Sequence, residues 1–146
     1  GDARGVLAAM ALGADGIYMG TRFMATHESD SHPLVKEAVV RGEDVCTASV
    51  PKDIMLARDL SNTFTKTYME MRGAGASAEE LGAFLDDHSQ YHSQHLGKAD
   101  DAEICCGQVA GLIDDVKGAG DVIDLIVGGM DSLFEELKQK LGSCME

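Results

Sequence analysis

The residues best suited to chemistry are Gly20 and Thr21, which directly follow a short apolar run at residues 17–19. Gly16 and Gly20 bound that run, and this pattern is typical of a short buried strand. A glycine at a strand's carboxyl end lets an anion approach the backbone, and a threonine adds a hydroxyl donor. Because parallel α/β barrels bind ligands at this edge, the pattern predicts half of a phosphate cradle. The alternative is a plain strand-to-loop turn that needs a glycine.

The histidines offer a second candidate site. His88, His92 and His95 recur at helical spacing beside Asp86 and Asp87, which is compatible with a metal-binding face. The setting is polar on every side, so a solvated helix face is the better interpretation and we predict no metal site.

The remaining polar residues have simpler interpretations. His27 and His32 are expected to form hydrogen bonds in a loop and at a helix start. Arg22 either neutralises a bound phosphate or anchors a small second domain of the chain through a salt bridge.

The four cysteines, Cys46, Cys105, Cys106 and Cys144, form no C-x-x-C pair and are interpreted as reduced thiols of a cytoplasmic protein.

The net charge of −13 over 146 residues argues against nucleic acid and anionic membranes as partners. We find no signal peptide and no apolar run of transmembrane length. The chain begins Gly-Asp rather than Met, and we expect it to be an excerpt of a longer protein.

Alternating elements are expected to position these residues in the first third of the chain. Asp2 is a suitable N-cap for a helix through Leu12, with Gly13 at its end. A strand is expected at residues 17–19. Pro33 suits the first turn of a helix over residues 34–40, and residues 45–50 have the alternation of a strand.

Helices are expected in the rest of the chain. Residues 54–71 favour a helix that is weakened at 61–63, and Ser77 with Glu80 forms a capping box for a helix to about His88. Breaks follow at 72–76 and 97–101. A helix is expected over 108–116. Asp121 is expected to cap a last helix, with a possible bend at the glycines 128–129. The expected apolar stripe of that helix consists of Ile126, Met130, Leu133, Leu137 and Leu141.

Residues 2–5 and 11–23 together resemble the FMN-dependent nitronate monooxygenases, also called 2-nitropropane dioxygenases. The FMN-dependent enoyl-acyl-carrier-protein reductases are close relatives of that family. The resemblance continues through 26–29 and 32–38, weakens over 57–64 and returns at 107–113. In order and spacing these segments cover most of the chain.

The resemblance implies an α/β fold, namely the C-terminal portion of a TIM (β/α)8 barrel with a small, mostly helical domain. Helix 7 of the barrel would lie at residues 2–12 and strand 8 at 16–20. The implied division is 1–42 for the end of the FMN-binding barrel, 43–100 for a small helical cap domain, and 101–146 for C-terminal helices that pack back on the barrel.

The resemblance also implies a site. Met19 would lie against the flavin, and the alternative is that it simply fills the barrel. Gln108 would line the substrate site. The family's catalytic histidine comes from an earlier part of the barrel, and no histidine here matches it, so we assign no catalytic residue and expect no turnover by this chain alone. The residues implied to hold FMN are Gly1, Tyr18, Met19, Gly20 and Thr21.

Several functions stay open. The first is FMN-dependent oxidation of alkyl nitronates with oxygen, and the second is enoyl-acyl-carrier-protein reduction with a nicotinamide nucleotide. An enzyme of the inosine-monophosphate dehydrogenase type shares part of the strand-8 pattern, but the matches at 32–38 and 107–111 argue against it. The last is a non-catalytic barrel remnant. The two flavin-dependent functions imply a small nitronate or acyl substrate, and a barrel remnant implies none. Exposed barrel faces favour a homo-oligomer.

Overall fold

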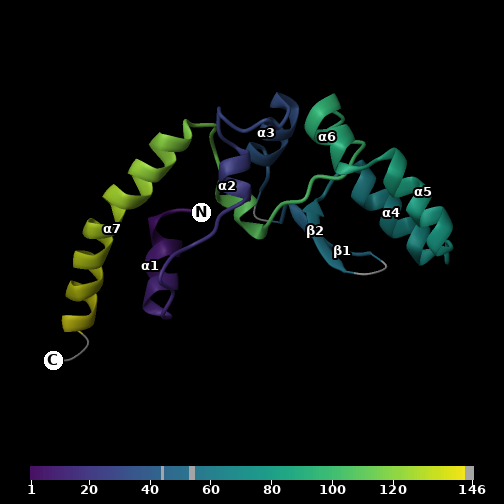
Figure 1. Cartoon of the computed structure of the whole chain (residues 1–146). Coiled ribbons are helices and arrows are strands. Elements are labelled where there is room, and N and C mark those ends of the chain that lie inside the picture. The colour runs from purple at the N-terminus through teal and green to yellow at the C-terminus, as the bar shows by residue number, and fades with distance from the viewer. Residues whose placement is uncertain (44, 53–54, 144–146) are drawn as a thin grey trace.

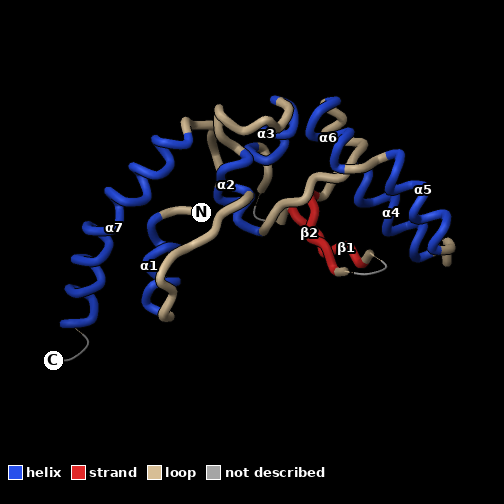
Figure 2. Tube along the Cα trace, viewed as in Figure 1, coloured by secondary structure: helices blue, strands red, loops and turns tan. Residues whose placement is uncertain are grey.

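The computed structural model describes residues 1–43, 45–52 and 55–143, which form an arch of mostly helical elements (Figures 1 and 2). One limb pairs α1 (Ala3–Ala11) with the long α7 (Ala119–Gly142). The crown holds α2 (Thr21–Met24), α3 (Pro33–Val40) and the 3-10 helix η1 (Gln108–Leu112). The other limb contains β1 (Thr47–Pro51), β2 (Leu56–Leu60), α4 (Thr63–Gly73), α5 (Ala78–Asp87) and α6 (Gln90–Leu96).

The first helices follow the predicted caps. Asp2 accepts a hydrogen bond from the Gly5 amide at 3.1 Å and begins α1, and Gly13 with a φ of +96° follows its end. His32 Nδ1 accepts from the Leu34 amide at 3.2 Å, and Pro33 is the first residue of α3. These predictions are confirmed because each cap depends on residues close to it in the sequence.

The predicted strand at residues 16–20 is wrong for this chain. Among the described residues, this segment enters no β-ladder and runs as an irregular connection from α1 to α2. A strand needs a neighbour that exchanges backbone hydrogen bonds with it. The apolar run is also not buried, since Tyr18 is 99% exposed and Ile17 is 41% exposed.

The predicted strand near residues 45–50 is confirmed as β1, but the helix predicted over 54–71 is wrong in its first half. That prediction begins at residue 54, outside the described residues. β2 pairs antiparallel with β1, with Ser49 opposite Arg58. Asn62 then accepts from the Thr65 amide at 3.0 Å and begins α4, so the polar triplet at 61–63 is a boundary and not a weak helix centre.

The capping box is confirmed at the start of α5. The Ser77 hydroxyl accepts from the Glu80 amide at 3.3 Å, and the Glu80 carboxylate accepts from the Ser77 amide at 2.8 Å. Gly97, with a φ of +73°, ends α6 at the predicted break.

The predicted helix at 108–116 is wrong, because only η1 forms there. The residues after η1 leave the helical path, and Lys117 forms a parallel bridge with Thr26. Gly118 is the N-cap of α7, and Asp121 lies in its first turn instead of capping it. One continuous helix runs through the glycines at 128–129. Ile126 is buried, whereas Leu137 and Leu141 stay 44% and 62% exposed.

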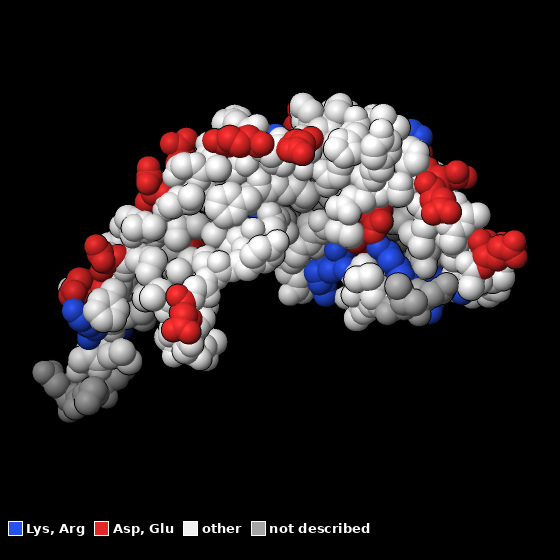
Figure 3. Space-filling model, viewed as in Figure 1, with Lys and Arg blue, Asp and Glu red and all other residues white. Residues whose placement is uncertain are grey.

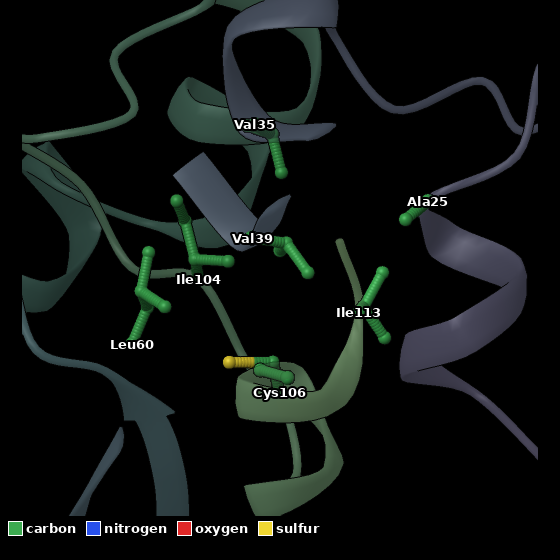
Figure 4. Close-up of a cluster of buried hydrophobic side chains, with 8 residues drawn as sticks. Ala25, Val35, Val39, Leu60, Ile104, Cys106 and Ile113 are labelled. Carbon is green, nitrogen blue, oxygen red and sulfur yellow. The ribbon is translucent and has the colours of Figure 1, made fainter. Parts of the chain in front are cut away.

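Three apolar clusters hold the arch together. The α1–α7 limb buries Val6, Val122 and Ile126, and the other limb buries Val50, Tyr68 and Leu81. The central cluster draws on α2's end, α3, β2 and η1, so it fixes the crown relative to the hairpin (Figure 4). It consists of Ala25, Val35, Val39, Leu60, Ile104, Cys106, Ala110 and Ile113.

The described cysteines Cys46, Cys105 and Cys106 are free thiols, as predicted, and Cys144 lies outside the described residues. No helix in the described ranges combines the length and hydropathy that a bilayer crossing requires.

Candidate functional site

A cleft of about 290 Å³ lies between the start of α1 and residues 17–22. It brings together all five residues that the family resemblance implies as cofactor-binding, although residues 17–19 do not form a strand. Its lining consists of Gly1, Asp2, Gly5, Val6, Ile17, Tyr18, Met19, Gly20, Thr21, Arg22 and Val109.

Gly20 and Thr21 leave polar backbone and hydroxyl groups accessible in this cleft. A Cβ atom added to Gly20 would meet nothing within 4 Å, so the backbone there faces open space. The Thr21 hydroxyl oxygen accepts a hydrogen bond from the Gly107 amide at 2.9 Å. A hydroxyl that accepts one bond keeps its own proton to donate. The pair can therefore present a donor to an anion while remaining fixed to the chain.

The other predicted residues line the same cleft in different ways. Gly1 is packed closely, since an added Cβ would lie 3.0 Å from the Cβ of Arg22. Met19 packs against the cluster of Val6, Val122 and Ile126, so it contributes to the core as well as to the lining. Tyr18 is almost fully exposed.

Arg22 acts as an anchor and not as a free cation. Its guanidinium donates to the Asp115 carboxylate at 3.3 Å and to the Ala25 and Asp115 carbonyls at 3.0 Å each. Burial lowers the pKa of Arg22, and the nearby Asp114 charge partly opposes this shift. A salt bridge is therefore present, but its partner lies in the segment before α7 and not in the small domain expected at 43–100. It ties the 20–25 turn to that segment.

Gln108 is exposed at the start of η1 and does not line the cleft, although its neighbour Val109 does. His88 follows the end of α5, and its ring lies tilted against Phe84 at 4.3 Å between centroids, whereas His92 and His95 belong to α6. The three histidines are thus on two elements rather than on one helix face.

A second, wider opening of about 440 Å³ adjoins the first along Gly20 and Thr21. Its other described lining residues include Arg58 and Cys106. The Cys106 amide donates to the Arg58 carbonyl at 3.1 Å, which aligns residues 104–106 with the outer edge of β2. Sequence reasoning missed Arg58 because it assigned that segment to a helix, and the signal available was the partial resemblance over 57–64.

A buried ion cluster lies behind this opening and was also missed. Asp59 is fully buried, and Lys52 Nζ lies 3.3 Å from its carboxylate while also contacting Glu103. Burial lowers the pKa of Lys52, but the Glu103 hydrogen bond and the charges of Asp59 and Glu103 outweigh it, so the pKa is raised overall. Cys105 donates to Glu103 at 3.2 Å. Lys52 therefore serves as the cation of this cluster.

Comparison with known proteins gives the same family by a family model and by curated relatives. A family model described as nitronate monooxygenase matches residues 1–129. Probable nitronate monooxygenases of Staphylococcus haemolyticus and Staphylococcus aureus strain JH9 are 39% identical over 75 residues and 35% identical over 74 residues. Each alignment covers 49% of this chain, and it covers 20% and 21% of the respective relative. The aligned region is thus about one fifth of these curated relatives.

Two solved structures resemble nearly the whole chain. FabK from Thermotoga maritima is 31% identical with a TM-score of 0.86, and the match covers 95% of this chain and 44% of FabK. A nitroalkane oxidase from Streptomyces ansochromogenes, 22% identical with a TM-score of 0.72, shares the fold over 93% of this chain and 38% of its own. This chain covers less than half of each of these two chains, which is consistent with a fold that corresponds to part of a barrel enzyme.

Proposed function

We propose, from the premise that this chain belongs to the nitronate monooxygenase family, that it forms the phosphate-binding part of a flavin site in an oxidoreductase. One observation carries the proposal. The cleft at Gly20 and Thr21 collects Gly1, Tyr18 and Met19 as well, and these are the residues that the family resemblance assigns to FMN.

The residues present fit a phosphate. Gly20 has open space where a side chain would stand, so an oxyanion can approach its backbone. The Thr21 hydroxyl keeps a proton to donate after accepting from Gly107. Arg22 is held by Asp115, so binding would depend on neutral donors rather than on an ion pair. FMN supplies the electron-transfer chemistry when bound, and the protein supplies its position.

For the whole protein we propose FMN-dependent oxidation of alkyl nitronates with oxygen, with a small nitronate as substrate. The catalytic base would come from an earlier part of the barrel. In this proposal residues 1–42 complete the barrel, 43–100 form a cap domain, and 101–146 return to the barrel. Gln108 keeps its proposed place near the substrate on the strength of the resemblance alone.

A second candidate is enoyl-acyl-carrier-protein reduction at the same flavin site. The specific observation in its favour is the likeness to FabK, at 31% identity and a TM-score of 0.86 over 95% of the chain. Both candidates place FMN at Gly20 and Thr21, so they share the test below and differ only in the substrate that the whole protein accepts.

Self-association is part of the proposal. Leu12, Leu125 and Leu141 on the α1–α7 limb are 90%, 60% and 62% exposed. Apolar surface of this kind is normally covered by another chain or another part of the same protein. Light scattering after size-exclusion chromatography is expected to give a mass above 15.5 kDa, and a stable monomer would contradict this expectation.

The flavin proposal is tested by titrating the chain into FMN and following quenching of flavin fluorescence. Riboflavin, which lacks the phosphate, is the control ligand. Saturable binding of FMN with no saturable binding of riboflavin supports a phosphate cradle. Equal binding of both ligands, or binding of neither, counts against a cradle in this chain.

A further inference from the structure

The opening beside β2 has a single charged side chain in its described lining. That residue is Arg58, and it faces an open space of about 440 Å³ together with Gly20 and Thr21 of the proposed flavin site. Arg58 is half-buried on β2, directly opposite Ser49 of β1. The hairpin therefore holds a cation beside the place proposed for FMN.

The Arg58 guanidinium is held in position by neutral groups. It donates to the Thr47 hydroxyl at 3.2 Å and to the Ser49 hydroxyl at 2.9 Å. Within residues 1–43, 45–52 and 55–143 it forms no ion pair with a carboxylate. A guanidinium has five N–H donors, so these two bonds leave three donors and the full charge for a ligand.

The rest of the lining carries no opposing charge. Burial raises the pKa of Cys106 to about 12 and also raises the pKa of Cys105, so both thiols are neutral near pH 7. Figure 3 shows Lys and Arg beside the β1–β2 hairpin on the inner side of the arch, with acidic side chains next to them and further acidic patches along the outer side. In a chain of net charge −13, a cation without a carboxylate partner among the described residues favours an anionic ligand.

We propose that Arg58 binds the anionic end of the substrate, a planar group with two oxygens such as a nitronate or a carboxylate. The guanidinium fork matches two oxygens in one plane, whereas a lysine would supply only a point charge. This inference rests on the proposed function, because the opening is a substrate site only if FMN lies at Gly20 and Thr21. Arg58 is thereby a specificity-determining residue.

The test is an NMR titration of the ¹⁵N-labelled full chain with ethyl nitronate and, separately, with nitroethane, its neutral conjugate acid. Propionate distinguishes a carboxylate from a nitronate, and inorganic phosphate reports general anion binding. We expect saturable shifts at Arg58, Gly20 and Gly107 with ethyl nitronate, propionate or both. Weaker shifts are expected with phosphate and none with nitroethane.

The variants are Arg58→Gln, Arg58→Lys and, as a matched control, Arg41→Gln, which removes an exposed arginine of α3's end that pairs with Glu37. Arg58→Gln is expected to weaken binding of the anion about tenfold or more, as loss of a charge-assisted pair does. Arg58→Lys is expected to recover only part of this loss, and Arg41→Gln is expected to bind as the parent chain does.

Equal binding of nitroethane, unchanged binding in a folded Arg58→Gln chain, or no binding of either two-oxygen anion by the parent chain would each overturn the inference. Circular dichroism establishes whether the variants fold. If Arg58→Gln does not fold, the nitronate affinity of Arg58→Lys is compared with that of the parent chain instead. Quenching of FMN fluorescence by Arg58→Gln separates the proposal of a flavin site at Gly20 and Thr21 from the proposal that Arg58 binds the substrate. Failure of FMN binding in the parent chain counts against the flavin site, whereas loss of only the nitronate response concerns Arg58.

Discussion

The amide of Gly107 donates a hydrogen bond to the hydroxyl of Thr21 at 2.9 Å across 86 positions of sequence. Next to this bond, the Cys106 amide donates to the Arg58 carbonyl at 3.1 Å. The segment at 105–107 therefore joins the glycine turn to the hairpin. As a result, the cleft at Gly20 and the opening at Arg58 share one wall.

Thr21→Val is expected to lower the free energy of unfolding by about 1–3 kcal/mol, because it leaves the Gly107 amide without its acceptor. It is also expected to weaken FMN binding, since the hydroxyl proton is lost. Thr21→Ser keeps both functions and is expected to stay near the parent chain. Urea unfolding and FMN quenching measure the two effects. Thr67→Val, which removes a hydroxyl bonded within α4, is the control, and an equal loss of FMN affinity there would contradict the assignment.

Arg22→Gln is expected to cost about 2–4 kcal/mol of stability, because three bonds from a buried guanidinium to Asp115 and Ala25 are lost. Arg22→Lys is expected to recover little, since an ammonium cannot reproduce the fork. Chemical denaturation measures both variants. If Arg22→Gln left stability unchanged and abolished only FMN binding, the anchor interpretation would be wrong and the phosphate interpretation correct.

Lys52→Met is expected to be strongly destabilising, by about 3–5 kcal/mol, because it leaves the carboxylate of Asp59 buried without a cation. Combining it with Asp59→Asn removes that charge and is expected to recover much of the loss. A double-mutant cycle by urea unfolding at pH 7 measures the coupling. Additive effects of the two substitutions would show that Lys52 does not compensate Asp59.

Asp100 is expected to make stability fall at acid pH. The Thr63 hydroxyl and amide donate to its carboxylate at 2.7 and 3.2 Å and hold the pKa of Asp100 below its ordinary value of 3.8. A lowered pKa in the folded state means that the contribution is complete above pH 3.8 and is lost as the pH falls through the folded-state pKa.

The measurement for this prediction is the urea midpoint between pH 6 and pH 2.5. Asp100→Asn is expected to flatten the acid limb of the stability curve. Thr63→Val keeps the amide donor and removes the hydroxyl, so an intermediate slope is expected. An unchanged slope in Asp100→Asn would rule out this carboxylate as a source of the acid sensitivity.

The sequence predicted well the elements whose signals are local. The caps at Asp2 and Ser77 and the proline at the start of α3 each depend on residues within one helical turn. Strands were harder to predict than helices, because a strand forms only where a neighbouring strand pairs with it. Residues 17–19 have no such partner among the described residues, whereas β2 pairs with β1. The periodicity of a sequence does not show which segments find a partner. Residues 56–60 alternate too weakly to be separated from a helix by pattern alone.

For the site, the residue types around Gly20 and Thr21 predicted a cradle, and the fold brings those residues to one cleft. The tie between Thr21 and Gly107 could not be predicted, because it joins residues far apart in the sequence. Arg58 was missed for the same reason, since its position depends on the pairing of β2 with both β1 and residues 104–106.

The most direct test of the central claim is the FMN affinity of Gly20→Ala beside that of Gly16→Ala. An added Cβ meets nothing within 4 Å at either position, so both variants are expected to keep the parent stability within about 0.5 kcal/mol. Only Gly20 lines the cleft, and we expect Gly20→Ala to weaken FMN binding about tenfold or more while Gly16→Ala leaves it unchanged. Equal FMN affinity in the two variants would contradict a phosphate site at Gly20.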